Sequence, residues 1–311
     1  MENIAKQLMN YYWLRPETVL WRLRDIELLQ NIELKGRSLD LCCGDGIYSF
    51  IRSGGEFSTA YDAFVDVKKV DKFFDGEDIY ADCLDSWDPS FIQKFPKNKI
   101  DVGYDWKQGL LDKAERLGLY GELIQGDANE KLNLPDESFD SVFSNAIYWM
   151  NNIEGLLGEL NRVLTDSGQL VVSVPDQGFV DSSLYGKFIN QNKLVPEYVT
   201  KLDRGRFHDN FQTVRSDEDW QLLFKESNFK VVEHKKYLSS QTIEAWDIGL
   251  RPFSPYLIRM QHKLSPKDLL DIKTDWVNEI TPIAFEYFQG ESLREAETGT
   301  GFNLYHLEKI G

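Results

Sequence analysis

The sequence has few cysteines, little positive charge and no long apolar run. Cys42, Cys43 and Cys83 are its only cysteines, and none belongs to a CxxC pair, which excludes a zinc site or dithiol motif of that pattern. So few cysteines are typical of a reducing compartment, and we expect a cytoplasmic location. No window approaches the about 18 apolar residues of a membrane span, and the charged N-terminal segment does not resemble a signal peptide.

The charge balance is strongly acidic. The chain has 51 Asp and Glu residues against 35 Lys and Arg residues, a formal net charge of −16. Binding to a nucleic acid backbone needs a basic surface, so we expect no nucleic acid partner. The hydrophobic share of 42% is ample for a core, and 311 residues suggest one large domain with an insertion.

Strand-like and helix-like runs alternate through the middle of the chain. Helical spacing of apolar residues and a closing glycine predict helices at 106–118 and 152–168. Apolar runs predict strands at 37–43, 99–105, 121–127, 139–145 and 168–175. Alternation of this kind predicts an α/β fold whose sheet is mostly parallel and covered on both faces.

The remaining segments suggest how the chain is organised. We expect a helical segment at 1–35, a core at 36–237 with an insertion at 54–98, a helical insertion at 238–297 and a final core strand at 298–311. Runs 229–238 and 301–310 would pair as antiparallel strands, with residues 238–297 inserted between them. Ligands of open α/β sheets bind outside the carboxyl ends of the strands, so the inserted segments would form a lid there.

The stretch SLDLCCGDGIYSF, residues 38–50, predicts a strand, a glycine turn and a helix. That arrangement brings backbone N–H groups close to a ligand. The GxGxxG fingerprint and the P-loop lysine are both missing. Acidic residues stand at the carboxyl ends of three successive predicted strands, at Asp40, Asp105 and Asp127. A carboxylate at the end of the second strand can accept hydrogen bonds from both hydroxyls of a ribose.

Four ordered motifs resemble the class I S-adenosylmethionine-dependent methyltransferases. They are LDLCCGDG (39–46), IDVGYD (100–105), QGDANEKLNLPDESFDSVFSNAIYWM (125–150) and LNRVLTDSGQLVVSVP (160–175). The resemblance implies a Rossmann-like, seven-stranded, mostly parallel sheet with an antiparallel last strand and a helical lid. It also implies S-adenosyl-L-methionine as the cofactor. The flanking segments resemble a bacterial branch that acts on small molecules and glycans, which favours a small-molecule or sugar acceptor, methylated at oxygen.

The resemblance also implies roles for individual residues. Asp40 and the turn from Cys42 through Gly44 to Gly46 would hold the methionine end of the cofactor. Asp105 would bind the ribose hydroxyls. Trp106 would pack on the adenine ring. Asp127, with Ala128 beside it, would accept a hydrogen bond from the adenine amino group. Asn145 would lie under the sulfonium.

The chain departs from the family pattern at two places. Cys42 stands where the family has its first glycine, and we expect a small thiol to be tolerated there if the backbone is not left-handed. We interpret Cys42 and Cys43 as small apolar residues in a tight turn. Asp105 lies unusually far from Asp40, and Asp62 is a rival acid. We reject Asp62 because a charged stretch follows it, without a helix and strand like those after Asp105.

Methyl transfer from a sulfonium requires mainly alignment and exclusion of water, with a base only when the acceptor loses a proton. His208 is the first candidate base, and Asp209 the next. Tyr148 and Trp149, just past the fourth strand, are candidate acceptor contacts, with Tyr185 and Arg206 as weaker ones. The acidic insertion shows no metal-ligand spacing, so we expect no metal.

Two other functions fit the residues less well. A nicotinamide-dependent oxidoreductase also needs a ribose-binding acid, but the fingerprint for its cofactor is missing. A catalytically silent cofactor-binding partner subunit would not need to keep the three acids. We also expect a possible homodimer.

Overall fold

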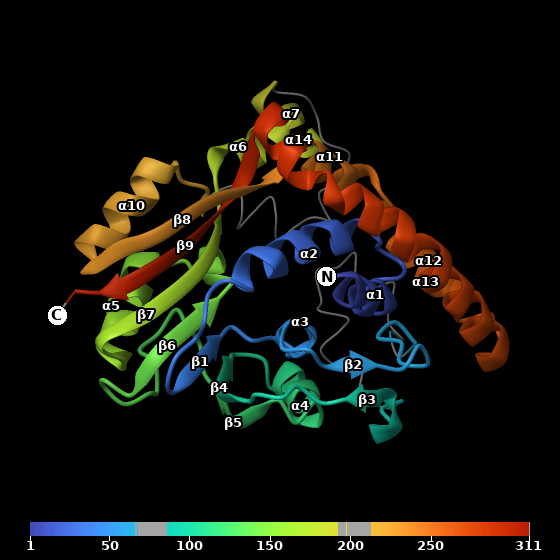
Figure 1. The fold of residues 1–311 in the computed structure, drawn as a ribbon, viewed down its shortest axis with the longest axis horizontal. Coiled ribbons are helices and arrows are strands. Elements are labelled where there is room, and N and C mark those ends of the chain that lie inside the picture. The colour runs from blue at the N-terminus through green and yellow to red at the C-terminus, as the bar shows by residue number, and fades with distance from the viewer. Residues whose placement is uncertain (66, 68–85, 192–196, 198–212, 311) are drawn as a thin grey trace.

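The computed structural model describes residues 1–65, 67, 86–191, 197 and 213–310. Its centre is a seven-stranded sheet in the order β5-β4-β1-β6-β7-β9-β8 (Figure 1). The strands are β1 (Ser38–Leu41), β4 (Ile100–Asp105), β5 (Tyr120–Gln125), β6 (Phe139–Ser144), β7 (Leu164–Pro175), β8 (Phe229–Ser239) and β9 (Thr300–Lys309).

The strand directions confirm the predicted fold class. The neighbouring pairs from β5 to β7 are all parallel, whereas β9 is antiparallel to both of its neighbours, β7 and β8. This is the Rossmann-like, mostly parallel sheet with an antiparallel last strand. β8 rather than β9 forms the edge of the sheet.

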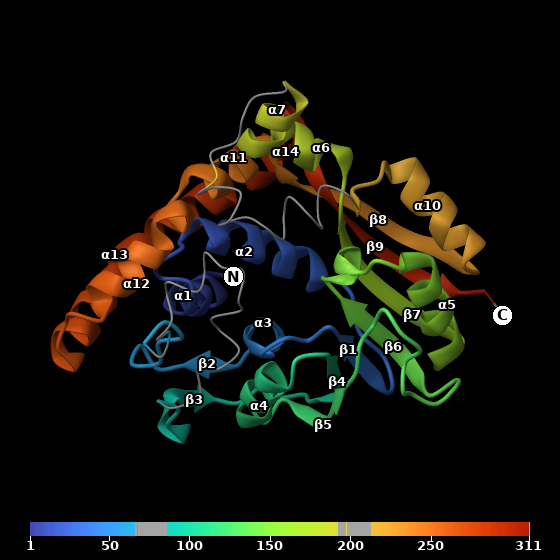
Figure 2. The same cartoon turned by 180° about the vertical axis from the view of Figure 1, so that it is seen from behind.

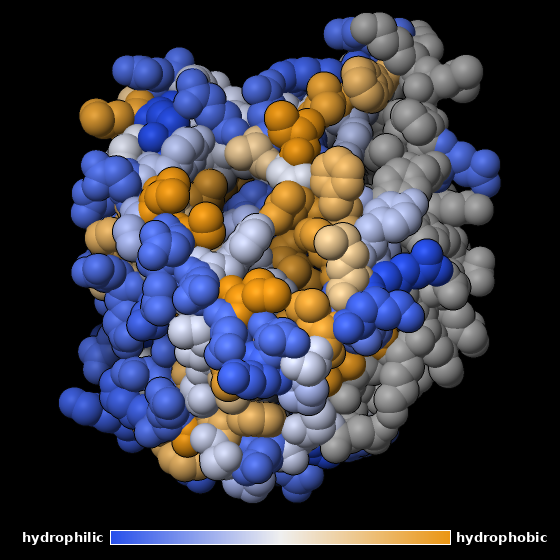
Figure 3. Space-filling model, turned by 90° about the vertical axis from the view of Figure 1, so that its right-hand side faces the viewer, coloured by the Kyte–Doolittle hydropathy of each residue, from blue (hydrophilic) through white to orange (hydrophobic). Residues whose placement is uncertain are grey.

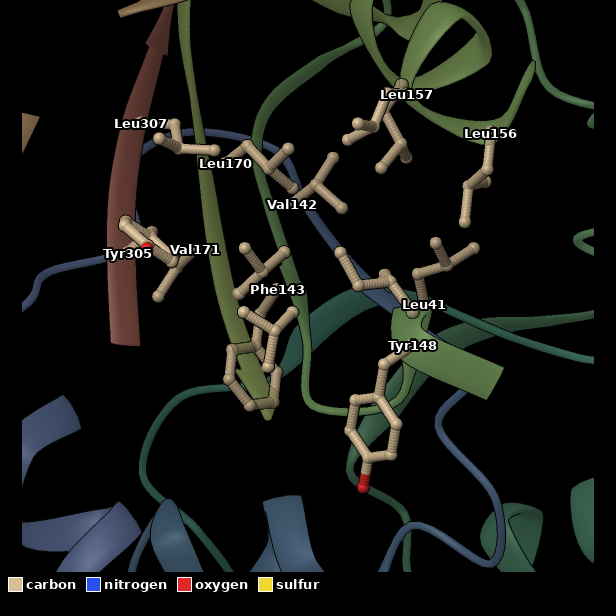
Figure 4. Close-up of a cluster of buried hydrophobic side chains, with 14 of the residues drawn as sticks. Leu41, Val142, Phe143, Tyr148, Leu156, Leu157, Leu170, Val171, Tyr305 and Leu307 are labelled. Atoms are coloured by element: carbon tan, nitrogen blue, oxygen red, sulfur yellow. The ribbon is translucent and has the colours of Figure 1, made fainter. Parts of the chain in front are cut away.

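Helices with one apolar face cover the sheet. α5 (Ile153–Val163) buries the predicted leucine and valine stripe, and the side chain of Asn152 caps its start by accepting from the N–H of Gly155 at 3.0 Å. The other helices of this part of the chain are α3 (Ile47–Arg52), α4 (Gln108–Arg116), α6 (Gln177–Ser182), α7 (Leu184–Asn190) and α10 (Asp217–Glu226), with the 3₁₀ turn η3 (Ile147–Trp149). Figure 4 shows part of the resulting core, where side chains of β6, β7, β9 and α5 meet.

The N-terminal segment forms two helices, α1 (Glu2–Tyr11) and α2 (Glu17–Leu29), with Pro16 at the start of the second. Figures 1 and 2 show α2 lying along the side of the sheet toward which β1 runs. Residues 54–98 contribute β2 (Glu56–Phe57), the 3₁₀ turn η2 (Pro89–Phe91) and β3 (Ile92–Lys94). β2 and β3 pair only with each other, in a separate antiparallel sheet.

Four helices follow β8 and precede β9. They are α11 (Ser240–Ile248), α12 (Ser254–Gln261), α13 (Pro266–Gln289) and α14 (Glu291–Thr298), with the 3₁₀ turn η5 (Arg251–Phe253). α13 packs along α1 and α2. Ion pairing ties this group to α2, because Arg24 donates to both carboxylate oxygens of Glu295 at 2.9 and 2.6 Å. No helix in the described ranges combines the length and apolar character needed to cross a membrane.

Candidate functional site

Four neighbouring parallel strands place the predicted cofactor residues at one edge of the sheet. β5, β4, β1 and β6 lie side by side, with Leu41 opposite Tyr104 and Asp40 opposite Phe143. The chain passes from β1 toward β5 and then returns to β6 on the other side of β1, which makes a topological switch point. We call this region the carboxyl edge, and it consists of Asp40, residues 42–46, Asp105, Asp127 and Asn145.

The glycine turn leaves β1 with left-handed backbone angles at three positions, Cys42 (φ 59°), Gly44 (58°) and Gly46 (73°). A Cβ added at Gly46 would lie 2.8 Å from the ring of Tyr120, so both space and backbone require glycine there. A Cβ at Gly44 would meet nothing within 4 Å. The turn therefore packs tightly at Gly46 and faces open space at Gly44, where a ligand can approach the backbone.

Cys42 differs from the sequence expectation. We expected the thiol to be tolerated only if the backbone is not left-handed, and the structure has the left-handed, glycine-like conformation at this position. A left-handed L-residue is strained by about 1–2 kcal/mol. Burial raises the pKa of the Cys42 thiol, and the carboxylates of Asp105, Asp40 and Asp127 raise it further. Cys42 is therefore a neutral thiol, and the charges of the three predicted cofactor acids, Asp40, Asp105 and Asp127, act on it.

Asp105 is held by backbone donors. Its Oδ2 accepts from the N–H of Gly44 at 3.0 Å and its Oδ1 from the N–H of Lys107 at 3.0 Å, and the side chain is 6% exposed. Burial raises the pKa of this carboxyl, and these N–H groups oppose the rise. Each carboxylate oxygen can accept a second hydrogen bond. Asp105 therefore ties the glycine turn to β4 and keeps acceptor capacity for two hydroxyls.

Asp40 is bonded within the protein. Its Oδ2 accepts from Ser49 Oγ at 2.6 Å and from Tyr120 Oη at 2.7 Å, and it is 3% exposed. Burial raises the pKa of Asp40, and Arg52 opposes this rise. These bonds link β1 to α3 and β5, which orients the turn between them. Its predicted contact with the cofactor stays a prediction.

The remaining predicted cofactor residues surround the same edge. Trp106 follows Asp105 and is 61% exposed, and the Lys107 ammonium lies over its ring, 5.0 Å from the ring centre. Asp127 lies two residues beyond β5, and its Oδ1 accepts from the N–H of Asn129 at 2.8 Å; Ala128 beside it is buried. Asn145 follows β6 directly.

The predicted acceptor contacts differ in burial and in position. Tyr148 lies in η3 and is buried, and Figure 4 shows its hydroxyl pointing away from the core side chains. Trp149 is exposed, with its ring 5.6 Å from that of Tyr148. Tyr185 donates its hydroxyl to the carbonyl of Asp247 at 3.0 Å, which ties α7 to α11. Arg206, His208 and Asp209 lie outside the described residues.

The rival acid lies elsewhere. Asp62 follows β2, which has no partner in the seven-stranded sheet. Its Oδ2 accepts from Trp13 Nε1 at 2.9 Å, and its Oδ1 from the N–H of Phe64 at 2.8 Å. Asp62 therefore joins the N-terminal segment to the loop after β2, and β4 is the strand beside β1.

A polar cluster that the sequence did not indicate lies on α2 beside the carboxyl edge. Asp25 is fully buried and accepts from Tyr48 Oη at 2.7 Å and Tyr237 Oη at 3.1 Å. The Arg22 guanidinium lies 3.6 Å from Asp25 and 5.3 Å from the Tyr48 ring centre, and its charge lowers the raised pKa of Tyr148. The i, i+3 spacing of Arg22 and Asp25 can be read from the sequence, but a charged pair at this spacing usually lies on the solvent-exposed face of a helix.

The described residues contain no metal-ligand cluster, and the described histidines lie outside the carboxyl edge. No three His, Cys, Asp or Glu side chains in the described ranges are arranged to hold a metal ion. His234, His262 and His306 bond to Asn303, the carbonyl of Phe64 and Gln169, respectively, all outside the carboxyl edge.

Comparison with known proteins gives a family for the central part of the chain. Residues 93–172, from β3 into β7, match a family model described as a methyltransferase domain. The match includes Asp105, Asp127 and Asn145 and begins after the glycine turn. No curated protein matches the chain. The resemblance drawn from the motifs is thereby confirmed for the class, as are methyltransferase activity and S-adenosylmethionine as cofactor.

Among the solved structures similar to this chain are three of low sequence identity. One is a protein from Thermotoga maritima described as an S-adenosylmethionine-dependent methyltransferase and possible histamine N-methyltransferase (18% identity, 75% of this chain and 81% of that chain, TM-score 0.42). Another is a putative methyltransferase from Bacillus halodurans (16%, 92% and 99%, TM-score 0.44). A third is the [4+2]-cyclase SpnF (14%, 95% and 82%, TM-score 0.47).

Proposed function

We propose that this chain, an S-adenosylmethionine-dependent methyltransferase by the match of its residues 93–172, methylates a hydroxyl of a small molecule or sugar. The observation that carries the proposal is the placement of Asp40, Asp105 and Asp127 at or just beyond the carboxyl ends of the neighbouring parallel strands β1, β4 and β5. The glycine turn after β1 is bonded to Asp105 and faces open space at Gly44. We further propose a cytoplasmic location and a homodimer.

The residues of the edge suit the cofactor. Asp105 would accept both ribose hydroxyls, because each of its oxygens has one backbone donor and room for a second bond. Trp106 would cover the adenine and Asp127, beside Ala128, would accept from its amino group. The turn from Cys42 to Gly46 and Asp40 would hold the methionine end, and Asn145 would lie beneath the sulfonium. When bound, S-adenosylmethionine supplies a methyl group on a positively charged sulfur, and a thioether leaves.

The protein's own part in the transfer is alignment and exclusion of water. Tyr148 and Trp149 would present the acceptor at the end of β6, with Tyr185 and Arg206 as further contacts. A hydroxyl acceptor loses its proton as the new C–O bond forms, and His208 is the proposed base that takes it. The oxygen preference rests on the resemblance to the glycan-directed branch.

Isothermal titration with S-adenosylmethionine, and with NAD and NADPH as controls, tests the cofactor half of the proposal. Binding of S-adenosylmethionine alone supports it, and binding of a nicotinamide cofactor instead contradicts it. Hydroxylated small molecules and sugars are then screened for formation of S-adenosylhomocysteine. If the cofactor binds tightly but no acceptor of any class turns over, the chain is a silent partner subunit.

A further inference from the structure

A cavity lies between the α12–α13 turn and the loop after β2. It has a volume of about 690 Å³ and is lined by four residues from the range 59–65, by Ser86 and Phe91, and by seven residues from the range 261–273. This volume is typical of a small-molecule site. None of its lining residues belongs to the carboxyl edge. We call it the Gln261 pocket.

Gln261, the last residue of α12, gives the pocket an unsatisfied polar group. Its side chain lines the cavity and is only 3% exposed, and neither Nε2 nor Oε1 has a hydrogen-bond partner. A buried polar group without a partner destabilises a protein, because it loses its hydrogen bonds to water and gains none in return. Native structures contain few of them, and each calls for an explanation. A ligand that pairs with the amide would supply one.

The charged groups of the pocket are already partnered. The Lys273 ammonium group donates to the carbonyl of Tyr61 and lies 3.8 Å from Asp62 Oδ2. Asp62 also accepts from Trp13 and from the N–H of Phe64. One cation and one anion therefore balance each other, and His262, which also lines the pocket, bonds to the carbonyl of Phe64. The described lining residues thus leave no unpaired charge for an ionic ligand.

The rest of the lining is mainly apolar. Leu269 and Pro266 of α13 and Phe91 contribute to the wall, and three apolar side chains at the opening are exposed: Val65 by 37%, Leu264 by 38% and Leu270 by 40%. Figure 3, which views the molecule from the side of α12 and α13, shows apolar residues gathered around a hollow. Apolar surface around an opening favours a ligand with an apolar body.

We propose that the Gln261 pocket binds a neutral, largely apolar small molecule that carries a carboxamide-type group. One N–H and one C=O side by side would pair with Oε1 and Nε2 of Gln261, and the apolar body would lie against Leu264, Leu269 and Leu270. Binding here does not depend on the proposed acceptor, because the two sites share no residue.

Three probes of the same size test the chemistry. We would titrate the full chain with 2-naphthamide, 2-naphthoate and 2-methylnaphthalene, and follow the fluorescence of the probes. We expect 2-naphthamide to bind at least about tenfold more tightly than the other two, because one fully paired buried amide is worth about 1–2 kcal/mol. Equal affinity for the amide and the hydrocarbon would overturn the proposal, as would tighter binding of the carboxylate.

Variants locate the binding. Gln261→Leu should lose the preference for the amide and keep the affinity for 2-methylnaphthalene, whereas Gln221→Leu, at an exposed position on α10, should change neither. Leu270→Trp or Leu264→Trp should block all three probes at the opening. A preference that survives Gln261→Leu, or binding unaffected by either tryptophan, would place the probe elsewhere and refute the assignment. Titration with S-adenosylmethionine checks that each variant retains its fold.

Discussion

The carboxyl edge and the Gln261 pocket hold their polar groups in opposite ways. At the carboxyl edge each oxygen of Asp105 has a backbone donor, and Oδ2 of Asp40 has two side-chain donors. In the Gln261 pocket the charges are paired, but the one amide is buried without a partner. The edge is thus organised before any ligand arrives, whereas the pocket keeps a group whose partner would have to come from outside.

The largest effect should come from removing the central acid of the carboxyl edge. Asp105→Ala removes the proposed acceptor of the ribose hydroxyls and the bond to Gly44. We expect the affinity for S-adenosylmethionine to fall about 100-fold, because two hydrogen bonds to a charged group are worth about 1.5 kcal/mol each.

Isothermal titration measures this effect, with Asp112→Ala on α4 as the control. Circular dichroism checks that both variants are folded. Asp62→Ala should leave cofactor affinity unchanged. If instead it abolishes binding while Asp105→Ala does not, the assignment of the second-strand acid is wrong.

The next effect concerns the pH dependence of stability through Lys273. Burial lowers the pKa of Lys273 from 10.5 to about 8, against the pull of Asp62. Between these values the amine is neutral in the folded chain and charged in the unfolded chain, so unfolding takes up a proton. Stability from this group therefore rises as pH increases from about 8 to 10.5, by about 3 kcal/mol in all at about 1.4 kcal/mol per unit.

Urea unfolding at several pH values tests this linkage. Lys273→Met should lose the rise, whereas Lys267→Met, at an exposed position on the same helix, should keep it. The same slope in the wild type and in Lys273→Met would show that Lys273 does not titrate in this window.

A smaller effect sharpens the contrast between the two regions. Gln261→Leu should raise stability in the absence of ligand by about 1–2 kcal/mol, since it removes two unpaired polar atoms. Gln169→Leu, whose amide bonds to the carbonyl of Glu33 and to Ser141, should lower it. Thermal unfolding of both variants measures the difference. Destabilisation by Gln261→Leu would mean that Gln261 has partners within the protein.

The smallest effect concerns the backbone at Cys42. Glycine adopts the left-handed conformation without strain, whereas alanine keeps the strain and loses the sulfur. We therefore expect Cys42→Gly to be more stable than Cys42→Ala by about 1 kcal/mol. Urea unfolding of the pair measures this difference directly. Equal stability would mean that the φ of 59° at this position stores no strain.

The sequence predicted the sheet and its carboxyl edge because both depend on local patterns. Apolar runs that end in Asp105 or lead to Asp127 lie within single strand–turn–helix units, so their spacing alone indicates where the acids meet. The polar cluster of Asp25, Tyr48 and Tyr237 could not be predicted in the same way. It joins α2, α3 and β8, and no local pattern indicates that a hydroxyl 212 positions away bonds to Asp25.

The Gln261 pocket shows the same limit. Lys273 and Asp62 are far apart in the chain, and their pairing depends on how α13 packs against the loop after β2. Cys42 shows a different limit of prediction from sequence. The residue type alone could not tell whether the backbone at this position is left-handed, and the structure shows a φ of 59° in a turn that packs on Tyr120 at Gly46 and bonds to Asp105 at Gly44.

The position of β9 has a consequence for the order in which the chain can fold. β9 lies between β7 and β8, but 60 residues, 240–299, separate it from β8 in the chain. During synthesis β8 therefore leaves the ribosome with no strand to pair with, and it must wait until the four helices and β9 have followed. Such long-range pairing slows folding and exposes an unpaired strand to aggregation. We expect refolding to include a late step in which β8 and β9 join the sheet together.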